Sequence, residues 1–359
     1  MLAESRFVDL LAQVLPPLEF KLYHLKTHLK KCRKLVFTSK SDKSVDAYAT
    51  HFFVLSLDGI DLLGLEVYIY ESREYTTMFV SKADTTGHYP SDKPPTQMGK
   101  VVQQLLRGLI RYYLPLDKPV RVCLFAKAER QYLFLGSAKN PLKHVLSDAQ
   151  LVKWWASCLD GLKSEFSSIK KCALQIPGAS EAAVKSYLPS NPQLPWTVGD
   201  IFWEGAPDDP TIAVKRIPRF PDDPKLRFLE FLVAEKRVKK VSRAQFWIEL
   251  QSRQEFRLGT TVGIFGLEGT VDKHESLEGN HSITQKEARL LREVTLEGDY
   301  STKSSAEYSS NEFASRVPSY AEIDVKGTLT TPVVKRTVET PQVNVLSAGL
   351  VRKKQKTQR

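Results

Sequence analysis

The sequence is poor in cysteine and has no long apolar run. Its 359 residues include four cysteines, Cys32, Cys123, Cys158 and Cys172. They show no Cys-x-x-Cys spacing and no nearby histidine pair, so we expect reduced thiols in or near the core, no disulfide framework and no metal site. No apolar stretch approaches the roughly 20 residues that cross a bilayer, and residues 1–15 carry charges unlike a secretory leader. We therefore expect an intracellular protein with no membrane contact.

Short ligand-binding motifs are also missing. The sequence has 18 glycines but no Gly-x-Gly, which excludes the dinucleotide fingerprint and similar glycine-rich pyrophosphate loops. It has no phosphate-binding P-loop, no His-Glu-x-x-His zinc motif and no Gly-x-Ser-x-Gly nucleophile elbow. Short motifs therefore indicate no more than a globular protein, whose 42% hydrophobic content suffices for one large core or two smaller ones.

Positive charge is abundant and concentrated. The formal net charge is +11, which favours polyanionic partners such as nucleic acid or acidic proteins. One basic cluster lies within residues 21–43, and a second ends the chain at Arg352, Lys353, Lys354, Lys356 and Arg359. The terminal run is typical of a nuclear-import signal or a nucleic-acid-binding patch, but a solvated chain end explains it equally well.

Apolar runs predict a sheet with helices on its faces. Runs bounded by turn residues predict strands at 52–57, 61–70, 76–82 and 120–125. The first two are joined by Asp58-Gly59, a dipeptide that suits the left-handed backbone angles of a tight hairpin turn. A segment of helical periodicity at 97–113 separates the last two. The order strand, helix, strand predicts an α/β fold.

Capping residues mark the starts of further helices. Helical periodicity extends over 147–166, 224–238, 242–256, 284–294 and 311–317. Ser147 with Gln150 forms a capping-box pattern, Asp223 before Pro224 suits an N-cap followed by a first helical residue, and Ser242 opens the next helix. Residues 318–343 are rich in Thr, Val, Pro and Ser without a period. We therefore predict a domain over 1–317, a flexible linker over 318–344 and a basic C-terminal tail over 345–359.

Six longer blocks carry a resemblance to a known family. They are VSKADT at 80–85, VCLF with QYLF at 122–134, KWW at 153–155, VGDIF at 198–202, FPDDPK at 220–225 and FWIELQ at 246–251. In this order they resemble the fungal chaperone-dependent histone acetyltransferases of the regulator-of-Ty-transposition type. The resemblance is close over residues 52–256, weaker to 317, and returns at 345–356.

The resemblance implies a fold, a reaction and partners. The family is similar in fold to the CREB-binding-protein acetyltransferases, with a central mixed sheet flanked by helices. It implies transfer of acetyl from acetyl-coenzyme A (acetyl-CoA) to a lysine near the start of the histone H3 core, in the nucleus and in connection with chromatin assembly and genome stability. Histone H3 with histone H4, presented by nucleosome-assembly-type and anti-silencing-type chaperones, are the implied partners. Autoacetylation, also a family property, matches Lys225.

Two adjacent carboxylates, Asp222 and Asp223, are the first candidates for catalysis. A substrate lysine, whose pKa is about 10.4 in water, must lose a proton before its nitrogen attacks a thioester, and a nearby carboxylate attracts the cation and can relay the proton. Side chains of adjacent extended residues point in opposite directions. We expect Asp223 to face the substrate and Asp222 to support the loop. A purely structural N-cap role for Asp223 has equal support.

Trp155 and Asp84 complete the predicted catalytic set. The resemblance places Trp155 at the channel for the acetyl group and the substrate lysine, and leaves Trp154 packed near the cofactor. Most tryptophans on the apolar side of a helix are simply core residues, which is the alternative for both. Asp84 matches a residue near the cofactor and the acetyl group. Its alternative is an Asx turn at the end of a strand.

The cofactor site is predicted from two loops and a helix start. The predicted residues are Ala83, Asp84, Thr85, Thr96, Phe125, Lys127, Arg130, Tyr132, Lys139, Lys143, His144, Val145 and Trp154. The cations among them suit the phosphates of the coenzyme, and Thr96 precedes a helix whose free amides suit a phosphate. Residues 92–95 and 128–129 depart from the family pattern, which puts phosphate contacts near Lys93 and a contact at Glu129 in doubt.

The sequence leaves one rival function. Because Cys123 and Cys158 fall in apolar patterns, we expect direct acetyl transfer without a thiol intermediate. The alternative is a noncatalytic basic adaptor that binds nucleic acid or acidic histone chaperones through the two basic clusters. Net charge alone favours the adaptor, so direct nucleic-acid binding stays open.

Overall fold

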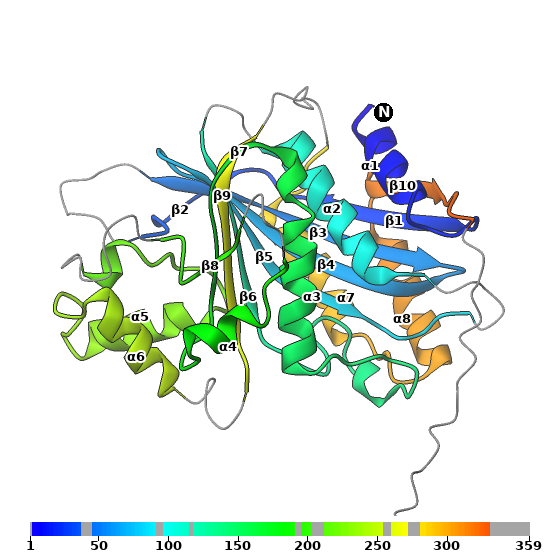
Figure 1. The fold of residues 1–359 in the computed structure, drawn as a ribbon. Coiled ribbons are helices and arrows are strands. Elements are labelled where there is room, and N and C mark those ends of the chain that lie inside the picture. The colour runs from blue at the N-terminus through cyan, green and yellow to red at the C-terminus, as the bar shows by residue number, and fades with distance from the viewer. Residues whose placement is uncertain are drawn as a thin grey trace, which may run out of the picture.

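The computed structural model of the protein is built on one ten-stranded mixed sheet (Figure 1). It describes residues 2–36, 45–90, 96–114, 118–190, 195–202, 212–253, 260–271 and 281–330. Its helices are α1 (Leu2–Ala12), α2 (Met98–Tyr113), α3 (Asp148–Asp160), α4 (Glu181–Lys185), α5 (Pro224–Ala234), α6 (Arg243–Gln251), α7 (Gln285–Glu297) and α8 (Lys303–Arg316). Its strands are β1 (Glu19–Lys26), β2 (Lys30–Cys32), β3 (Asp46–Leu57), β4 (Ile60–Glu71), β5 (Thr76–Thr85), β6 (Val120–Ala126), β7 (Phe166–Gln175), β8 (Thr197–Val198), β9 (Gly263–Val271) and β10 (Glu322–Lys326).

The sheet mixes parallel and antiparallel pairs. The strand order is β10-β1-β3-β4-β5-β6-β9-β7-β8, and β2 pairs with the first residues of β3. Only β5–β6 and β7–β8 are parallel among the described pairs. The β5–β6 pair is joined by α2, as parallel neighbours require a crossover. The predicted strand, helix, strand unit and the predicted fold class are confirmed.

The hairpin of β3 and β4 forms at the predicted dipeptide. Asp58 and Gly59 have φ of 50° and 77°, so both central residues are left-handed, as a tight primed turn requires. The turn pairs Leu57 with Ile60, and a register shift follows at Ser56. Nearly every side chain of both strands is buried, because helices cover this part of the sheet on both faces.

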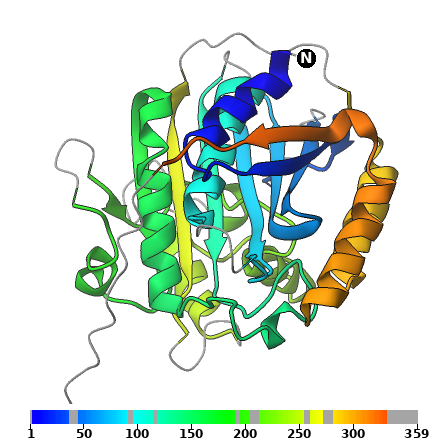
Figure 2. The same cartoon turned by 90° about the vertical axis from the view of Figure 1, so that its right-hand side faces the viewer.

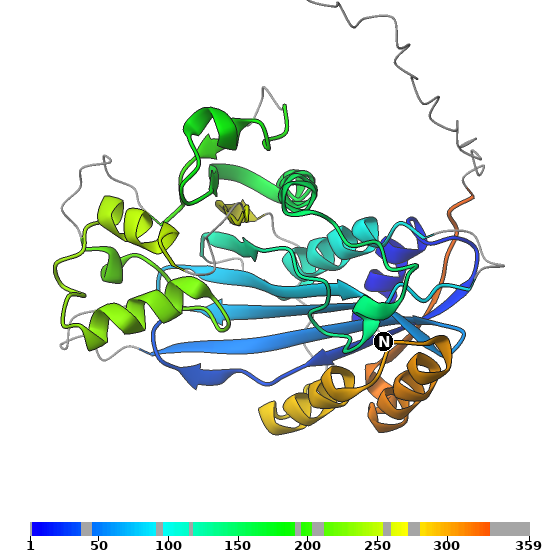
Figure 3. The same ribbon diagram turned by 90° about the horizontal axis from the view of Figure 1, so that it is seen from below.

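Helices cover the two faces in separate groups. On one face α1, α2 and α3 share a core with residues such as Val122 and Leu124 of β6. On the other face, Cys123 of β6 packs with α5 and α6, while α7 and α8 pack over β1, β3 and the residues after β6. Figures 2 and 3 show α3 and the α7–α8 pair on opposite sides of the sheet.

The predicted starts of α3, α5, α6 and α7 are correct, whereas the predicted start of α8 and several predicted ends are wrong. Ser147 and Thr284 form capping boxes, and the side chains of Asp223 and Ser242 cap α5 and α6. The helix predicted to reach Phe166 ends at Asp160 because Gly161 favours its end, and Leu162 and Phe166 are buried from a turn and from β7 instead. Helices α5 and α6 also end early, at Ala234 and Gln251, and α8 begins well before 311.

The predicted linker contains a strand. Residues 322–326 form β10, which pairs antiparallel with β1 through contacts such as Phe20 with Val325. Ile323 and Val325 are buried in the main core, and the residues between and beside them are polar. This alternation of apolar and polar residues over five positions is typical of a strand and was overlooked in the sequence. The basic tail and residues 331–344 lie outside the described residues.

All four cysteines are free, as predicted. Burial raises the pKa of the Cys123 and Cys158 thiols to about 12 and that of Cys172 to about 11, so these thiols are neutral near pH 7. Within the described chain, no helix has the length and apolar content of a membrane span.

A buried histidine pair predicts a pH dependence of stability. His24 Nε2 and His51 Nδ1 lie 3.0 Å apart, and the His24 ring stacks on Phe53 at 4.1 Å. Burial lowers the pKa of His24 to about 3 and that of His51 well below its usual value. Between pH 6.5 and 3 the unfolded chain therefore binds more protons than the folded one, and stability falls as pH falls, by about 1.4 kcal/mol per pH unit for each histidine.

Urea unfolding of the wild type and of His51→Gln at pH 7.5, 6.5 and 5.5 measures this effect. Glutamine cannot titrate, so the variant is expected to lose less stability between pH 6.5 and 5.5 than the wild type. Equal losses for the two proteins would contradict the assignment.

Candidate active site

Asp84, near the end of β5, anchors the loop that follows β6. Its Oδ2 accepts hydrogen bonds from three consecutive backbone N–H groups, of Tyr132, Leu133 and Phe134, at 2.7, 2.9 and 3.4 Å. Its Oδ1 accepts a hydrogen bond from Lys143 Nζ at 2.7 Å, and both side chains of this ion pair are 5% exposed. Asp84 thus holds the loop in place from both ends, and both of its oxygens are used.

The same loop is fixed by smaller contacts. Asn140 Nδ2 donates to the carbonyl of Thr86 at 3.1 Å, and Lys143 Nζ donates to Ser137 Oγ at 2.8 Å. Gly87 has a φ of 75°, and a Cβ there would lie 2.5 Å from the Lys143 Cα. Only glycine allows this approach of the two backbones. Residues 84–88 and 131–143 therefore form one packed unit.

The turn before α5 places Asp222 and Asp223 in different environments. Asp223 is 1% exposed; its Oδ1 accepts the N–H of Lys225 at 2.9 Å, which is the N-cap bond of α5, and its Oδ2 pairs with Lys225 Nζ. Asp222 has a φ of 55° and a side chain that is 70% exposed. Its carboxylate accepts a hydrogen bond from Lys82 Nζ at 2.6 Å, which lowers its pKa. Asp222 is therefore the open carboxylate of the turn.

This geometry reverses the predicted division of tasks. We expected Asp223 to face the substrate and Asp222 to support the loop. Asp223 instead caps the helix and neutralises a buried lysine, because its neighbour Pro224 begins α5 and directs the carboxylate onto the first helical turn. The contacts of Asp223 are those of a structural N-cap, which was the alternative prediction. The accessible negative charge of the turn belongs to Asp222.

Lys225 is buried against aromatic rings. It is 2% exposed, and its Nζ lies 5.6 Å from the ring centre of Phe125 and 5.9 Å from that of Phe220. Phe220 stacks on Phe79 of β5 at 4.2 Å with nearly parallel rings. The ring faces favour a cation, and Asp223 neutralises it. The predicted cofactor residue Phe125 therefore lies next to the predicted autoacetylation residue.

Charged groups connect the turn to the sheet and to α7. Lys82, two residues before Asp84 in β5, also lies 3.6 Å from Glu66 of β4. Glu66 has a fully buried side chain and pairs with Arg292 of α7 at 2.5 Å. Since Asp84 and Lys82 share a strand, β5 holds both the anchor of the loop after β6 and the partner of Asp222. The regions around positions 84, 125–143 and 222–225 therefore converge on one part of the molecule.

The two tryptophans of α3 lie on the opposite face of the sheet from the Asp223 turn. Trp155 is 4% exposed and belongs to the core of α1, α2 and α3. Trp154 packs edge-on against it, with ring centres 4.4 Å apart, and is less buried. No described contact joins Trp155 to Asp84 or Asp223. Its predicted role in the channel is untested, and its surroundings are those of a core residue.

The predicted phosphate-binding cations differ in availability. Lys143 is committed to Asp84, Lys127 pairs with Glu129 at 2.6 Å, and Arg130 donates to the carbonyl of Ala138 at 3.0 Å. Lys139 and His144 are exposed. Burial of Tyr132 raises its pKa, so its phenol stays protonated and can donate a hydrogen bond.

The remaining predicted cofactor residues surround the start of α2 and the end of β5. Thr96 Oγ1 lies 2.7 Å from the Tyr89 hydroxyl. The carbonyl of Thr96 accepts a hydrogen bond from the N–H of Met98, so the Met98 amide is not free to bind a phosphate. Ala83 and Thr85 are half-buried, and Val145 is 40% exposed. Residues 92–95, where the family pattern is broken, lie outside the described residues.

Sequence reasoning missed Glu66, Lys82 and Phe220 as site residues. Lys82 lies within the block at 80–85 that carried the resemblance, and Phe220 begins the block at 220–225. Glu66 is an acid in an otherwise apolar strand, which usually signals a paired buried charge. The buried acid could therefore have been noticed in the sequence, but the residues that pair with Glu66 could not, because Arg292 is distant in sequence.

Lys82→Met tests the link between Asp222 and the sheet. The change removes the group that lowers the pKa of Asp222 and the tether of a left-handed turn. We expect acetyl transfer to fall about tenfold, which corresponds to about 1.4 kcal/mol, with Lys82→Arg recovering most of it. Steady-state rates against pH measure both effects, and Lys100→Met, an exposed lysine on α2, is the matched control. Equal rates for Lys82→Met and the control would exclude the role.

A family model and known proteins match the chain. The histone acetyltransferase KAT11-type domain matches residues 7–114 and 100–323. A histone acetyltransferase rtt109 from Schizosaccharomyces pombe is 30% identical over 320 residues, which cover 83% of this chain and 82% of the relative. The protein of the same name from Candida albicans is 30% identical over 276 residues, or 60% of this chain and 73% of the relative.

A solved structure has the same fold. The crystal structure of Rtt109 from Aspergillus fumigatus aligns with a TM-score of 0.79 at 24% sequence identity. The alignment covers 90% of this chain and all of the other chain. The arrangement of sheet and helices described above is therefore shared over nearly the whole length.

Proposed function

Because the chain belongs to the histone acetyltransferase KAT11-type family, we propose that it acetylates a core-proximal lysine of histone H3 by direct transfer from acetyl-CoA. The family makes the protein a histone lysine acetyltransferase, for which acetyl-CoA is the implied cosubstrate. The substrate lysine, the direct transfer and the chaperones are our proposal. The observation that supports it most is the convergence of the Asp84-anchored loop with the turn of Asp222, Asp223 and Lys225.

We assign the loop at 131–143 to the cofactor. Asp84 fixes its backbone, and Tyr132, Lys139 and His144 offer a phenol, a cation and an imidazole from its surface. These groups suit the phosphates and amides of the coenzyme. Lys143 supports the loop from beneath and does not contact phosphate.

We assign Asp222 to the substrate. Its exposed carboxylate is ionised at neutral pH, since Lys82 lowers its pKa, and it attracts the ammonium group of an incoming lysine. Once deprotonated, the substrate nitrogen attacks the thioester carbon. The C–N bond forms as the C–S bond breaks, coenzyme A leaves as the thiolate, and one proton is released. Cys123 and Cys158 are neutral thiols buried in the core, which supports transfer without an acyl-cysteine.

The partners follow from the family resemblance. We propose that histone H3 with histone H4 is presented by nucleosome-assembly-type and anti-silencing-type chaperones, and that the reaction takes place in the nucleus. The basic tail at 345–359, which lies outside the described residues, suits contact with an acidic chaperone and nuclear import. The end of the linker at 344 remains part of the proposal, and the domain limit moves from 317 to the end of β10.

Acetyl-CoA is expected to stabilise the folded protein. At about 100 times its dissociation constant a ligand adds about 2.7 kcal/mol, which is about 4 °C in Tm for a domain of about 320 residues. Thermal unfolding with and without the cofactor measures the shift, with bovine albumin as the control for nonspecific binding. An unchanged Tm would favour the noncatalytic adaptor.

Mass spectrometry of histones tests the function itself. Histone H3–H4 complexes are incubated with the protein and isotopically labelled acetyl-CoA, with and without each chaperone. We expect label on a lysine near the start of the H3 core, more with chaperone than without, and label on Lys225. Label on neither histone would refute the proposed activity, and label independent of chaperone would refute the presentation step.

A further inference from the structure

Positive charge is concentrated in the segment that forms the short 3-10 helix η3 (Ala213–Lys215) and the helices α5 and α6. Residues 212–253 contain eleven Lys and Arg and five Asp and Glu, a net charge of +6 out of +11 for the whole chain. This segment belongs to neither of the two basic clusters at 21–43 and 345–359. Its charge is therefore a separate feature of the folded domain.

Five of its cations are exposed and without an ion pair to any residue that the structure describes. They are Lys236 and a group of four, Lys215, Arg216, Lys239 and Lys240. Nearby cations differ, since Arg237 pairs with Glu235 and Glu249 and Arg243 pairs with Asp200. Four of the five carboxylates of the segment are paired, and only Glu230 has no ion pair with a described residue, so the exposed cations outnumber the available carboxylates.

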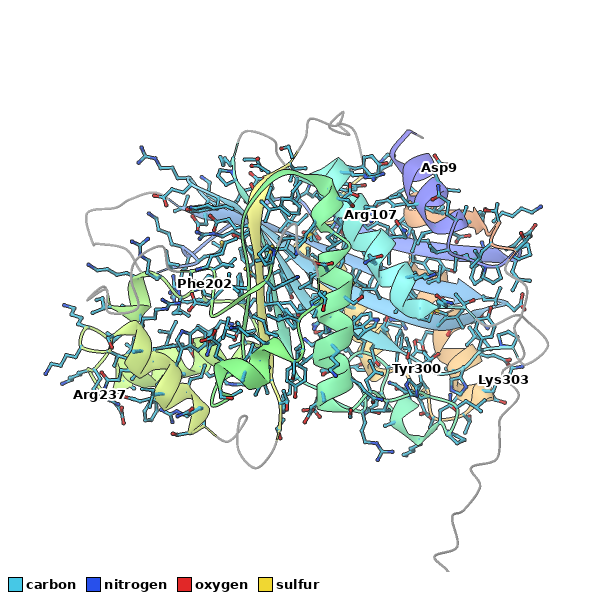
Figure 4. The ribbon with its side chains drawn as sticks, viewed as in Figure 1. Asp9, Arg107, Phe202, Arg237, Tyr300 and Lys303 are labelled. Atoms are coloured by element: carbon cyan, nitrogen blue, oxygen red, sulfur yellow. The ribbon has the colours of Figure 1, made fainter. Side chains whose placement is uncertain are left out.

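Backbone contacts bring the four cations together. Ile212 and Ser242 form an antiparallel bridge, and the N–H of Ala213 donates to the carbonyl of Val241 at 3.0 Å. The segment that carries Lys215 and Arg216, in and after η3 (Ala213–Lys215), is therefore joined by backbone contacts to the segment that carries Lys239 and Lys240. Figure 4 shows Arg237, from the same α5–α6 connection, at the outer end of the molecule.

A pocket extends this surface toward the sheet. Its volume is about 200 Å³, and its lining includes Lys215 and Arg216 together with Arg73 and Lys34. Arg73 is also exposed and has no ion pair with a described residue. Phe220 lines the pocket and lies 5.9 Å from Lys225 Nζ. The basic surface therefore borders the candidate active site without sharing its carboxylates.

We propose that the face formed by Arg73, Lys215, Arg216, Lys239 and Lys240 binds the phosphate backbone of duplex DNA. A duplex presents one negative charge per about 1.7 Å of its axis, and a row of exposed lysines and arginines neutralises it without reading sequence. Lysine is depleted in protein–protein interfaces, which favours nucleic acid over an acidic protein. The inference does not depend on the proposed acetyl transfer.

Fluorescence anisotropy with a labelled 20-base-pair duplex tests the surface on the full chain. The variant Lys215→Gln, Arg216→Gln, Lys239→Gln, Lys240→Gln is expected to bind at least tenfold more weakly. Its slope of log affinity against log salt is expected to be smaller by about 3–4, since each phosphate contact contributes about 0.9. The control variant neutralises four cations elsewhere, Lys100, Lys286, Arg289 and Lys303, and is expected to keep most of the affinity.

Two results would overturn the proposal. Equal weakening in both variants would place the binding in overall charge or in the basic tail. The second result compares polyglutamate with DNA as ligands at the same salt concentration. If the wild type binds both equally well and only the first variant loses this binding, the face would be assigned to an acidic protein. Unchanged circular dichroism and Tm for both variants confirm that the fold is intact.

Discussion

Asp84→Asn is expected to weaken cofactor binding nearly as much as Asp84→Ala. Both carboxylate oxygens of Asp84 accept hydrogen bonds, Oδ2 from three backbone N–H groups and Oδ1 from Lys143. In either orientation an asparagine presents an NH₂ group to one set of donors, and the buried Lys143 loses its only described carboxylate. Breaking a buried pair in this way costs about 3–5 kcal/mol.

The loss falls mainly on the loop at 131–143. We expect KM for acetyl-CoA to rise at least tenfold and Tm to fall by about 4–8 °C, at about 1.5 °C per kcal/mol for a domain of about 320 residues. Lys139→Met removes an exposed cation of the same loop and serves as the matched control, with a change of less than about threefold in KM and no change in Tm. A stable Asp84→Asn protein with ordinary KM would show that the loop does not depend on this carboxylate.

Asp223→Asn is expected to have the second large effect. Asparagine caps a helix as well as aspartate does, so the bond to the Lys225 N–H can persist. The Lys225 ammonium, however, is left buried among Phe125 and Phe220 without its described charge partner. We expect a loss of about 3–5 kcal/mol in the free energy of unfolding and at least a tenfold loss of acetyl transfer.

A second variant separates stability from chemistry. Asp223→Asn combined with Lys225→Met removes both charges, so urea unfolding is expected to recover to within about 2 kcal/mol of the wild type. Acetyl transfer is expected to stay low if the pair supports the site, and to recover if its role is only to stabilise α5. Wild-type stability of the single Asp223→Asn variant would contradict the buried ion pair itself.

Local signals in the sequence predicted much of the fold. The Asp58-Gly59 turn and the caps at Ser147, Asp223, Ser242 and Thr284 are confirmed, because each depends on a few adjacent residues. Strand β9 was missed since three glycines among its nine residues lower its strand propensity. It forms because β6 and β7 pair with it on both sides, which no local pattern reveals.

The candidate site was only partly predictable. The blocks that carried the resemblance contain Asp84, Asp222, Asp223 and Lys225, and the structure brings their surroundings together. The orientation of Asp222 and the burial of Lys143 were not predictable, because they depend on partners 140 and 59 positions away. Direction within a turn is decided by such contacts, not by residue type.

Hydrogen–deuterium exchange with acetyl-CoA tests the central claim most directly. The claim is that the Asp84-anchored loop and the turn before α5 form one site. Saturating acetyl-CoA is predicted to slow exchange of backbone amides in residues 84–88 and 126–145, with a smaller effect at 220–227. Protection confined to other segments, or none in these three, would contradict the account.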